Sequence, residues 1–156
     1  MSVLRIALAA LVTDQVTKAL ALAGLTWGTP VAVMPGLNLT LGLNTGASFG
    51  MLSGIMADRP LLMALGTGIL TLGFAVMALR TRDPLERGGL ALIVGGATGN
   101  ILDRLRQGAV TDFLDLYWRD WHWPAFNFAD VAIVCGAALT LASHFVLSRK
   151  HGKTDA

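Results

Sequence analysis

The chain has 156 residues, of which 54% are hydrophobic and only 14% are charged, and its mean hydropathy is +0.61. Ordinary soluble domains carry about 25% charged residues, so this composition excludes a soluble globular protein and indicates an integral membrane protein. The net charge is +2, and the basic residues are spread along the chain without forming a run, which argues against a nucleic-acid partner.

Four segments are long and apolar enough to cross a bilayer, which requires about 20 mostly apolar residues. They cover about residues 3–24, 60–80, 88–107 and 127–148. Because they use over half of the chain, we expect one all-α membrane domain over residues 1–156. Its two sizeable loops are residues 25–59 and 108–126.

The first span carries polar residues in its middle. Asp14 and Lys18 stand four residues apart on one helical face, in the order that favours an ion pair. Because they interrupt the apolar run, we predict a retained span and not a cleaved signal peptide. A buried ion pair that fixes helix packing is the favoured role, and direct participation in chemistry is the alternative.

A β-strand is predicted after the first span. Leucines alternate with polar or small residues from Leu37 to Leu43, which is the period of a half-buried strand. Val31 and Val33 precede it, and Pro35-Gly36 has the chemistry of a tight turn. Open sheet edges cannot face lipid, so we expect a small hairpin or sheet outside the membrane core, with a solvated connector as the alternative.

Asn44 and Gly46 follow this strand directly. Their backbone amides could bind an extended peptide, and a plain turn is the competing interpretation.

The second span, residues 60–80, has no ionisable residue in its interior and is expected to be structural. Gly66, Gly68 and Gly73 suit close contact with another helix.

The third span ends in a run of small residues followed by Asn100, Asp103 and Arg104. Asn100 and Arg104 share a helical face, and a guanidinium there could hold carboxylates or carbonyl oxygens by forked hydrogen bonds. A scaffold that orients other acids and a contact with substrate both fit this pattern.

The last two spans are joined by a Trp-rich loop or helix with an aspartate at each end, Asp112 and Asp130, so both carboxylates belong to one membrane face. Acids near hydrocarbon are functional candidates, because burying one there costs about 2.5 to 3.5 kcal/mol at a helix centre. Two close carboxylates share a proton and offer a base and an acid together, which peptide hydrolysis by water requires.

Other roles for these acids remain open. They could line a proton or ion pathway, and Asp130 could cap the last helix. A Ser-Lys dyad of Lys18 with Ser48 or Ser53 ranks behind the aspartate pair. The chain has a single cysteine, Cys135, which we expect to be buried, and its histidines are scattered. These residues do not form a metal site, so we expect no metal and no cofactor.

The basic residues predict the orientation, because they concentrate on the cytoplasmic side of membrane proteins. With four spans, one side carries seven of them and the other three, so both termini are predicted to be cytoplasmic. The seven are Arg5, Arg80, Arg82, Arg87, Arg149, Lys150 and Lys153. All four tryptophans then lie on the outer side, as an interfacial belt would.

Five motifs together resemble those of bacterial lipoprotein signal peptidase, the signal peptidase II family. They are Asp14-Gln15-Val16-Thr17-Lys18, Asn44-Thr45-Gly46-Ala47-Ser48-Phe49, Gly95 to Arg104, Gly108-Ala109-Val110-Thr111-Asp112-Phe113 and Phe126-Asn127-Phe128-Ala129-Asp130. The resemblance runs from about residue 5 to 148. One departure is Ser48, where the family more often has Ala.

The resemblance implies an aspartic endopeptidase of the bacterial inner membrane. It would remove the signal peptide of a prolipoprotein just before the cysteine that carries diacylglycerol, with Asp112 and Asp130 as catalytic residues. Site support or substrate contact would come from Asp14, Lys18, Asn44, Gly46, Asn100, Asp103, Arg104 and Asn127. It also implies four helices with an extracytoplasmic β-sheet cradle, contact with membrane lipids, and inhibition by cyclic peptides such as globomycin.

Two other classes of function fit the sequence less well. A small proton-coupled transporter or channel would bind near the midplane and often shows internal repeats, whereas these acids cluster near one surface and no repeat is visible. An inert membrane assembly factor would tolerate loss of either aspartate. The Trp-rich loop could close over the scissile bond as a lid.

Overall fold

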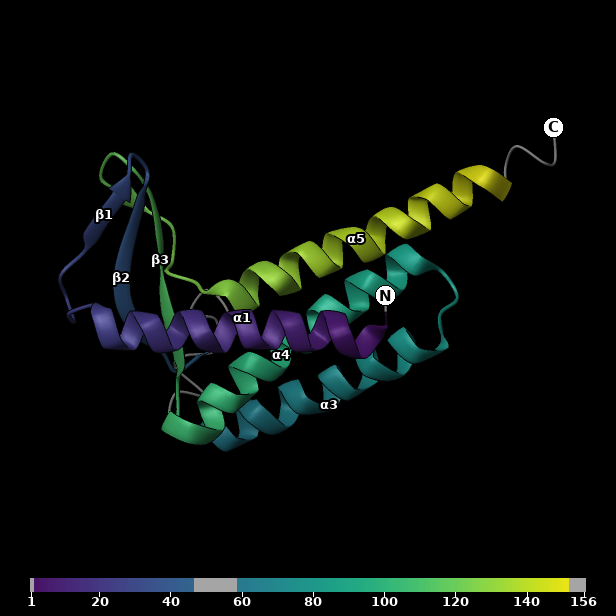
Figure 1. Cartoon of the computed structure of the whole chain (residues 1–156), viewed down its shortest axis with the longest axis horizontal. Coiled ribbons are helices and arrows are strands. Elements are labelled where there is room, and N and C mark those ends of the chain that lie inside the picture. The colour runs from purple at the N-terminus through teal and green to yellow at the C-terminus, as the bar shows by residue number, and fades with distance from the viewer. Residues whose placement is uncertain (1, 47–58, 152–156) are drawn as a thin grey trace.

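The structure, a computed structural model, is described over residues 2–46 and 59–151, with side chains described as far as residue 145. Its elements in chain order are α1 (Val3–Gly24), β1 (Val31–Met34), β2 (Leu37–Asn44), α3 (Pro60–Arg80), α4 (Pro84–Gln107), β3 (Val110–Trp118), β4 (Trp121–His122) and α5 (Phe128–His151). The helices form an elongated bundle with the sheet at one end. The start of α1, the α3–α4 connection and the end of α5 lie at the other end (Figure 1).

Helices occupy all four predicted segments. In the described part of the chain, α1, α3 and α5 are long and apolar enough to cross a membrane, so the chain is a multi-pass membrane protein. The third helix starts at Pro84, earlier than predicted, because the Asp83 carboxylate accepts a hydrogen bond from the Glu86 amide at 2.8 Å. A proline in the first turn after an aspartate cap is a strong helix start.

Helix α4 is the centre of the bundle and packs against α1, α3 and α5. Its glycines permit the close approach, as the predicted run of small residues suggested. A Cβ at Gly95 would lie 2.8 Å from the Ala10 Cβ in α1, and one at Gly89 would lie 2.6 Å from the Gly136 carbonyl oxygen in α5. Small residues are what allow helix backbones to meet in a membrane.

Two expectations about small residues in the spans are wrong. Gly66, Gly68 and Gly73 in α3 have no described atom within 4 Å of a Cβ placed on them, and Cys135 in α5 is exposed on the protein surface. A helix that is apolar on every side does not mark in its sequence which face meets a neighbour and which meets lipid.

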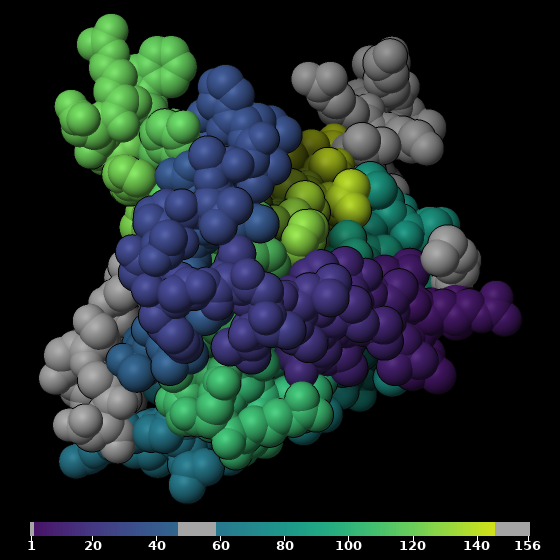
Figure 2. All heavy atoms as spheres, turned by 60° about the vertical axis from the view of Figure 1, so that its left-hand side comes forward, coloured from purple at the N-terminus to yellow at the C-terminus, as the bar shows by residue number. Residues whose placement is uncertain are grey.

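The four strands form one antiparallel sheet in the order β1-β2-β3-β4. The predicted hairpin is confirmed, with Val31 opposite Leu39 and the turn glycine, Gly36, at φ +89°. In the space-filling view β1 and β2 (blue) lie beside the end of α1, and the β3–β4 hairpin (green) projects at the upper left (Figure 2).

The prediction that residues 108–126 form a loop or helix is wrong. Most of the segment is β3 and β4, because β2 offers an open edge and β3 pairs with it from Leu37 opposite Leu116 to Asn44 opposite Val110. The run Val110–Trp118 is rich in β-branched and aromatic residues, which suit a half-buried sheet.

Adding one methyl group to the α4–α5 contact tests this packing. We expect Gly89→Ala to lower the free energy of unfolding by about 1–3 kcal/mol, because its Cβ meets backbone atoms of α5 that cannot move independently. The measurement is thermal unfolding of the purified protein in detergent, followed by circular dichroism.

The matched control is Gly66→Ala, where the methyl meets open space and alanine favours a helix by up to about 1 kcal/mol. Equal stability of the two variants would contradict the close α4–α5 contact.

Candidate active site

The chain path brings Asp112 and Asp130 to one place. Gly108 ends α4 in a left-handed conformation at φ +78°, with its amide donating to the Arg104 carbonyl, and turns the chain into β3. The chain returns from the hairpin so that Phe126 pairs with Leu114, through amide-to-carbonyl bonds of 3.0 and 2.9 Å. Helix α5 therefore begins beside the strand that carries Asp112.

Asp112 is almost completely buried, with 3% of its surface exposed. Its carboxylate accepts hydrogen bonds from the side-chain amides of Asn127 at 2.6 Å and Asn44 at 3.1 Å. Burial, followed by the nearby charge of Asp130, raises the pKa of Asp112 from its ordinary value of 3.8 to about 7. This carboxyl group can therefore hold or release a proton near neutral pH.

Asp130 and Asn127 cap the start of α5 reciprocally. The Asn127 amide donates to Asp130 Oδ2 at 3.2 Å, and the Asp130 amide donates to Asn127 Oδ1 at 3.0 Å. This is the arrangement of a capping box, so the interpretation of Asp130 as a helix cap is borne out by geometry. The other carboxylate oxygen accepts from Asn100 Nδ2 at 3.0 Å, and Asn127 is fully buried between the two aspartates.

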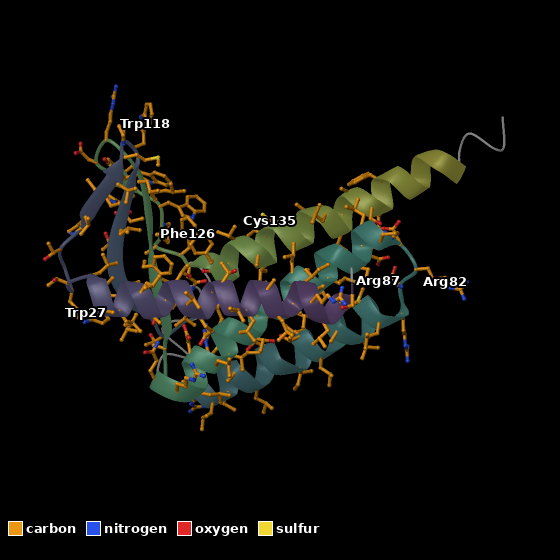
Figure 3. The ribbon with its side chains drawn as sticks, in the orientation of Figure 1. Trp27, Arg82, Arg87, Trp118, Phe126 and Cys135 are labelled. Carbon is orange, nitrogen blue, oxygen red and sulfur yellow. The ribbon has the colours of Figure 1, made fainter. Side chains whose placement is uncertain are left out.

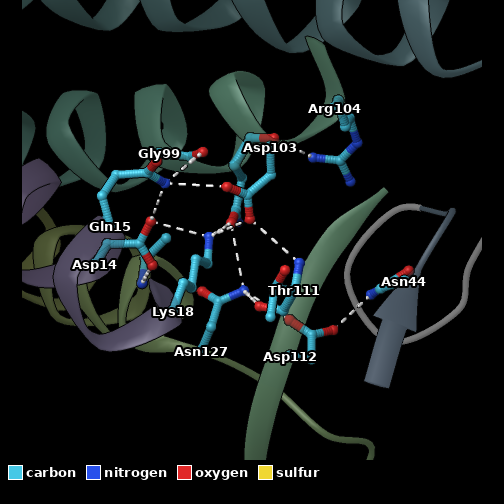
Figure 4. A network of polar contacts seen from close by, with 12 residues as sticks. Asp14, Gln15, Lys18, Asn44, Gly99, Asp103, Arg104, Thr111, Asp112 and Asn127 are labelled. Atoms are coloured by element: carbon cyan, nitrogen blue, oxygen red, sulfur yellow. Dashed lines mark hydrogen bonds and ion pairs between the residues drawn. The ribbon is translucent and has the colours of Figure 1, made fainter. Parts of the chain in front are cut away.

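A buried ion-pair network around Lys18 lies next to Asn127 and Asp112 (Figure 4). The Lys18 ammonium is 2.9 Å from Asp14 and 2.9 Å from Asp103, and it donates to Asn100 Oδ1 at 2.8 Å. The predicted pairing of Asp14 with Lys18 is confirmed. Asn100 therefore accepts a hydrogen bond from Lys18 and donates one to Asp130.

The two flanking carboxylates tie this network to the neighbouring elements. Asp14 accepts from the Ala129 amide at 2.9 Å, and Asp103 accepts from the Thr111 amide at 3.2 Å. These bonds fix the residues next to Asp130 and Asp112 respectively. The carboxylates therefore hold α5 and β3 in register with α1 and α4.

Arg104 fixes the segment that follows β2. Its guanidinium donates to the Gly46 carbonyl at 2.7 Å and to the Asn100 carbonyl at 3.3 Å. The Gly46 amide donates to the Asn44 side chain at 3.0 Å, so this amide is used within a turn and is not available to a peptide. The turn interpretation is therefore favoured for Gly46. Ser48 and Ser53, and with them the Ser-Lys alternative, lie outside the described residues.

One buried acid near the site was not identified from the sequence. Asp115 on β3 accepts from His122 Nδ1 at 2.8 Å and from Asn38 at 3.2 Å, which ties the hairpin together. The alternation of β3 could have indicated it, once the segment was known to be a strand. Among the described residues no cluster of three or more His, Cys, Asp or Glu side chains could hold a metal ion.

Comparison with known proteins identifies the family of the chain. Residues 6–146 match the family model described as Signal peptidase (SPase) II. The chain belongs to the signal peptidase II family. All ten residues that the sequence analysis assigned to the site lie within the matched range. They are Asp14, Lys18, Asn44, Gly46, Asn100, Asp103, Arg104, Asp112, Asn127 and Asp130.

Several signal peptidase II relatives are similar in sequence to this chain over most of its length. A lipoprotein signal peptidase of Hydrogenovibrio crunogenus is 40% identical and covers 95% of this chain and 87% of its own. One from Geobacter metallireducens is 42% identical, with coverage of 93% and 91%.

Two solved structures described as bacterial membrane enzymes also match, both at 28% identity. Their TM-scores are 0.81 and 0.78, and they cover 92% and 90% of this chain and 87% and 90% of their own. The fold is therefore that of a bacterial membrane enzyme.

The raised pKa of Asp112 predicts a pH-dependent stability. Between pH values of about 4 and about 7 the folded protein binds the Asp112 proton more tightly than the unfolded chain does, so the wild type loses stability as pH rises through this window. Asp112→Asn removes this loss. We expect the stability of the variant, relative to wild type, to rise across the window and to be flat outside it.

The measurement is the unfolding midpoint of both proteins in detergent across that range. The control Leu114→Ala, on the same strand and without a titrating group, should change stability by the same amount at every pH. A difference between Asp112→Asn and wild type that does not vary with pH would contradict the raised pKa.

Proposed function

We propose that this chain is an aspartic endopeptidase that cleaves the signal peptide from diacylglyceryl-modified prolipoproteins, on the N-terminal side of the lipidated cysteine. Membership of the signal peptidase II family and the relatives named lipoprotein signal peptidases support the substrate class. The observation that carries the chemistry is the buried pair of carboxylates bridged by Asn127, with the pKa of Asp112 at about 7.

In the proposed mechanism Asp112 and Asp130 share one proton. The ionised carboxylate takes a proton from a water molecule as the water attacks the scissile carbonyl carbon, and the protonated one donates a hydrogen bond to the carbonyl oxygen. When the carbon–nitrogen bond breaks, a carboxyl proton moves to the leaving amine. Peptide hydrolysis then needs no cofactor.

The remaining predicted residues act as positioning residues in this proposal. Asn127 and Asn44 hold the carboxylate of Asp112, and Asn100 holds that of Asp130. Asp14, Lys18 and Asp103 fix Asn100 and the backbone at both aspartates, while Arg104 and Gly46 fix the segment after β2. A site held by packed side chains and a second layer of hydrogen bonds keeps its catalytic groups in register.

We further propose one domain with four transmembrane helices, in which α4 is the third span, in the bacterial inner membrane. Helix α4 carries more charge than the other three, but Asp103 and Arg104 are buried in the polar network and do not meet lipid. The ends that carry most of the basic residues lie opposite the sheet (Figure 1), which supports cytoplasmic termini and an extracytoplasmic site.

The transporter alternative is less well supported. Its acids should line a path near the middle of the spans, whereas Asp112 lies on a strand and Asp130 in the first turn of α5, at the end of the bundle that meets the sheet. Because a signal peptide is itself an apolar helix, its cleavage site would emerge at this end. Cyclic peptides such as globomycin are expected to compete with it.

The test is cleavage of a purified diacylglyceryl-prolipoprotein in detergent. We expect Asp112→Asn and Asp130→Asn each to lower kcat by about 10³-fold or more, because each removes one half of the acid–base pair. The matched control is Asp115→Asn, on the same strand as Asp112 and paired with His122, which should stay within a few-fold of wild type.

A metal chelator should leave the wild-type rate unchanged. Cleavage that survives either Asp112→Asn or Asp130→Asn would refute the aspartate-pair mechanism and direct attention to Lys18 and the serines.

A further inference from the structure

An apolar groove starts at Asp130 and runs along α5. It has a volume of about 370 Å³, and apart from Asp130 its lining is hydrophobic or the thiol of Cys135. One wall is formed by Leu116, Trp123 and Phe126, and the other by Val131, Val134 and Cys135. Phe126 and Cys135 lie on the side of the molecule that faces away from α3 (Figure 3).

The size of the groove fits a hydrocarbon chain of the proposed substrate. A cavity of about 150 Å³ holds a benzene molecule, so this groove has room for a hydrocarbon chain.

The position of the groove points to the same part of the substrate. A second groove, of about 310 Å³, lies on the Asp112 side and is lined by the end of β2, with Asn44 and Gly46, and by Pro124 and Ala125. The carboxylate pair therefore lies between a groove with polar residues and an apolar one. The substrate at the scissile bond also has a polar and an apolar part. The peptide backbone is polar, and the hydrocarbon chains branch from the side chain of the diacylglyceryl cysteine.

The apolar groove is also open at the protein surface. Val134 is 62% exposed and Leu116 is 45% exposed, although both line the groove. An acyl chain could therefore enter sideways from the bilayer without leaving an apolar environment, which minimises the hydrophobic area that has to pass through water.

We propose that this groove binds one acyl chain of the substrate's diacylglyceryl group and so places the lipidated cysteine next to Asp130. This inference rests on the proposed function and names Leu116, Trp123, Val131 and Val134 as residues that determine specificity for the lipid.

The experiment fills the groove and varies the lipid. In Val134→Trp the indole occupies part of the groove. The substrates are two prolipoproteins that differ only in acyl length, one with long chains and one with very short chains. We expect kcat/KM of the variant to fall by about tenfold or more for the long-chain substrate, because losing the burial of only two methylene groups has that effect. For the short-chain substrate it should change less than about twofold.

The matched control is Ala132→Trp, on the same helix. Ala132 lines a neighbouring groove among α1, α4 and α5, which shares Val131 and Cys135 with the first groove but contains neither aspartate. We expect this variant to cleave both substrates as wild type does. Either of two results would overturn the proposal. In the first, Ala132→Trp and not Val134→Trp lowers kcat/KM for the long-chain substrate. In the second, Val134→Trp remains folded and lowers kcat/KM equally for both substrates.

A second measurement does not depend on a variant that folds. A prolipoprotein with a photoreactive group in one acyl chain is bound to wild-type protein and irradiated, and the adducts are mapped by mass spectrometry. Adducts on Leu116, Trp123 or Val134 support the groove, and adducts confined to Ala9 or Leu92 in the other groove overturn it. Wild type that cleaves neither substrate would instead refute the proposed function.

Discussion

The structure depends on one buried cation. The Lys18 ammonium lies among the helices with a carboxylate on either side, Asp14 and Asp103, and a third acceptor in Asn100. Removing one partner of such a buried pair commonly costs about 3–5 kcal/mol, because the other charge is left without compensation. Since Asp14 also binds the Ala129 amide and Asp103 the Thr111 amide, the same charges fix the two segments that present the aspartates.

Asn127 links the two aspartates to each other. Its backbone and side-chain oxygen close the start of α5 with Asp130, and its side-chain amide binds Asp112. A neutral side chain between the two carboxylates binds both without adding a charge next to either of them. The close packing of α4 against its neighbours keeps water away from this cluster, which is why burial is the main cause of the raised pKa of Asp112.

Most of the helices and the polar partners were predictable because they follow local rules. Hydrophobic length marks the helical segments, and spacing of four residues marks the Asp14–Lys18 pair. The strand character of residues 110–118 was missed because its partner β2 is distant in sequence, and a Trp-rich stretch alone resembles a membrane-surface loop. The packed face of α3 could not be predicted because its side chains are apolar all round, and Asp115 became recognisable only when β3 was placed beside Asn38.

Because only Asp130 takes part in the capping box, the two aspartates differ in how much the stability of the fold depends on them. Asp112 lies within β3, whose backbone pairing does not involve its carboxylate, whereas the carboxylate of Asp130 also closes the first turn of α5. A descendant of this protein released from selection for its reaction would lose little helix stability by changing Asp112. A change at Asp130 would remove the N3 side chain of the capping box and leave the Asn127 amide without its acceptor. Pseudoenzymes of this lineage are therefore expected to lose Asp112 first and to keep Asp130 as a structural relic.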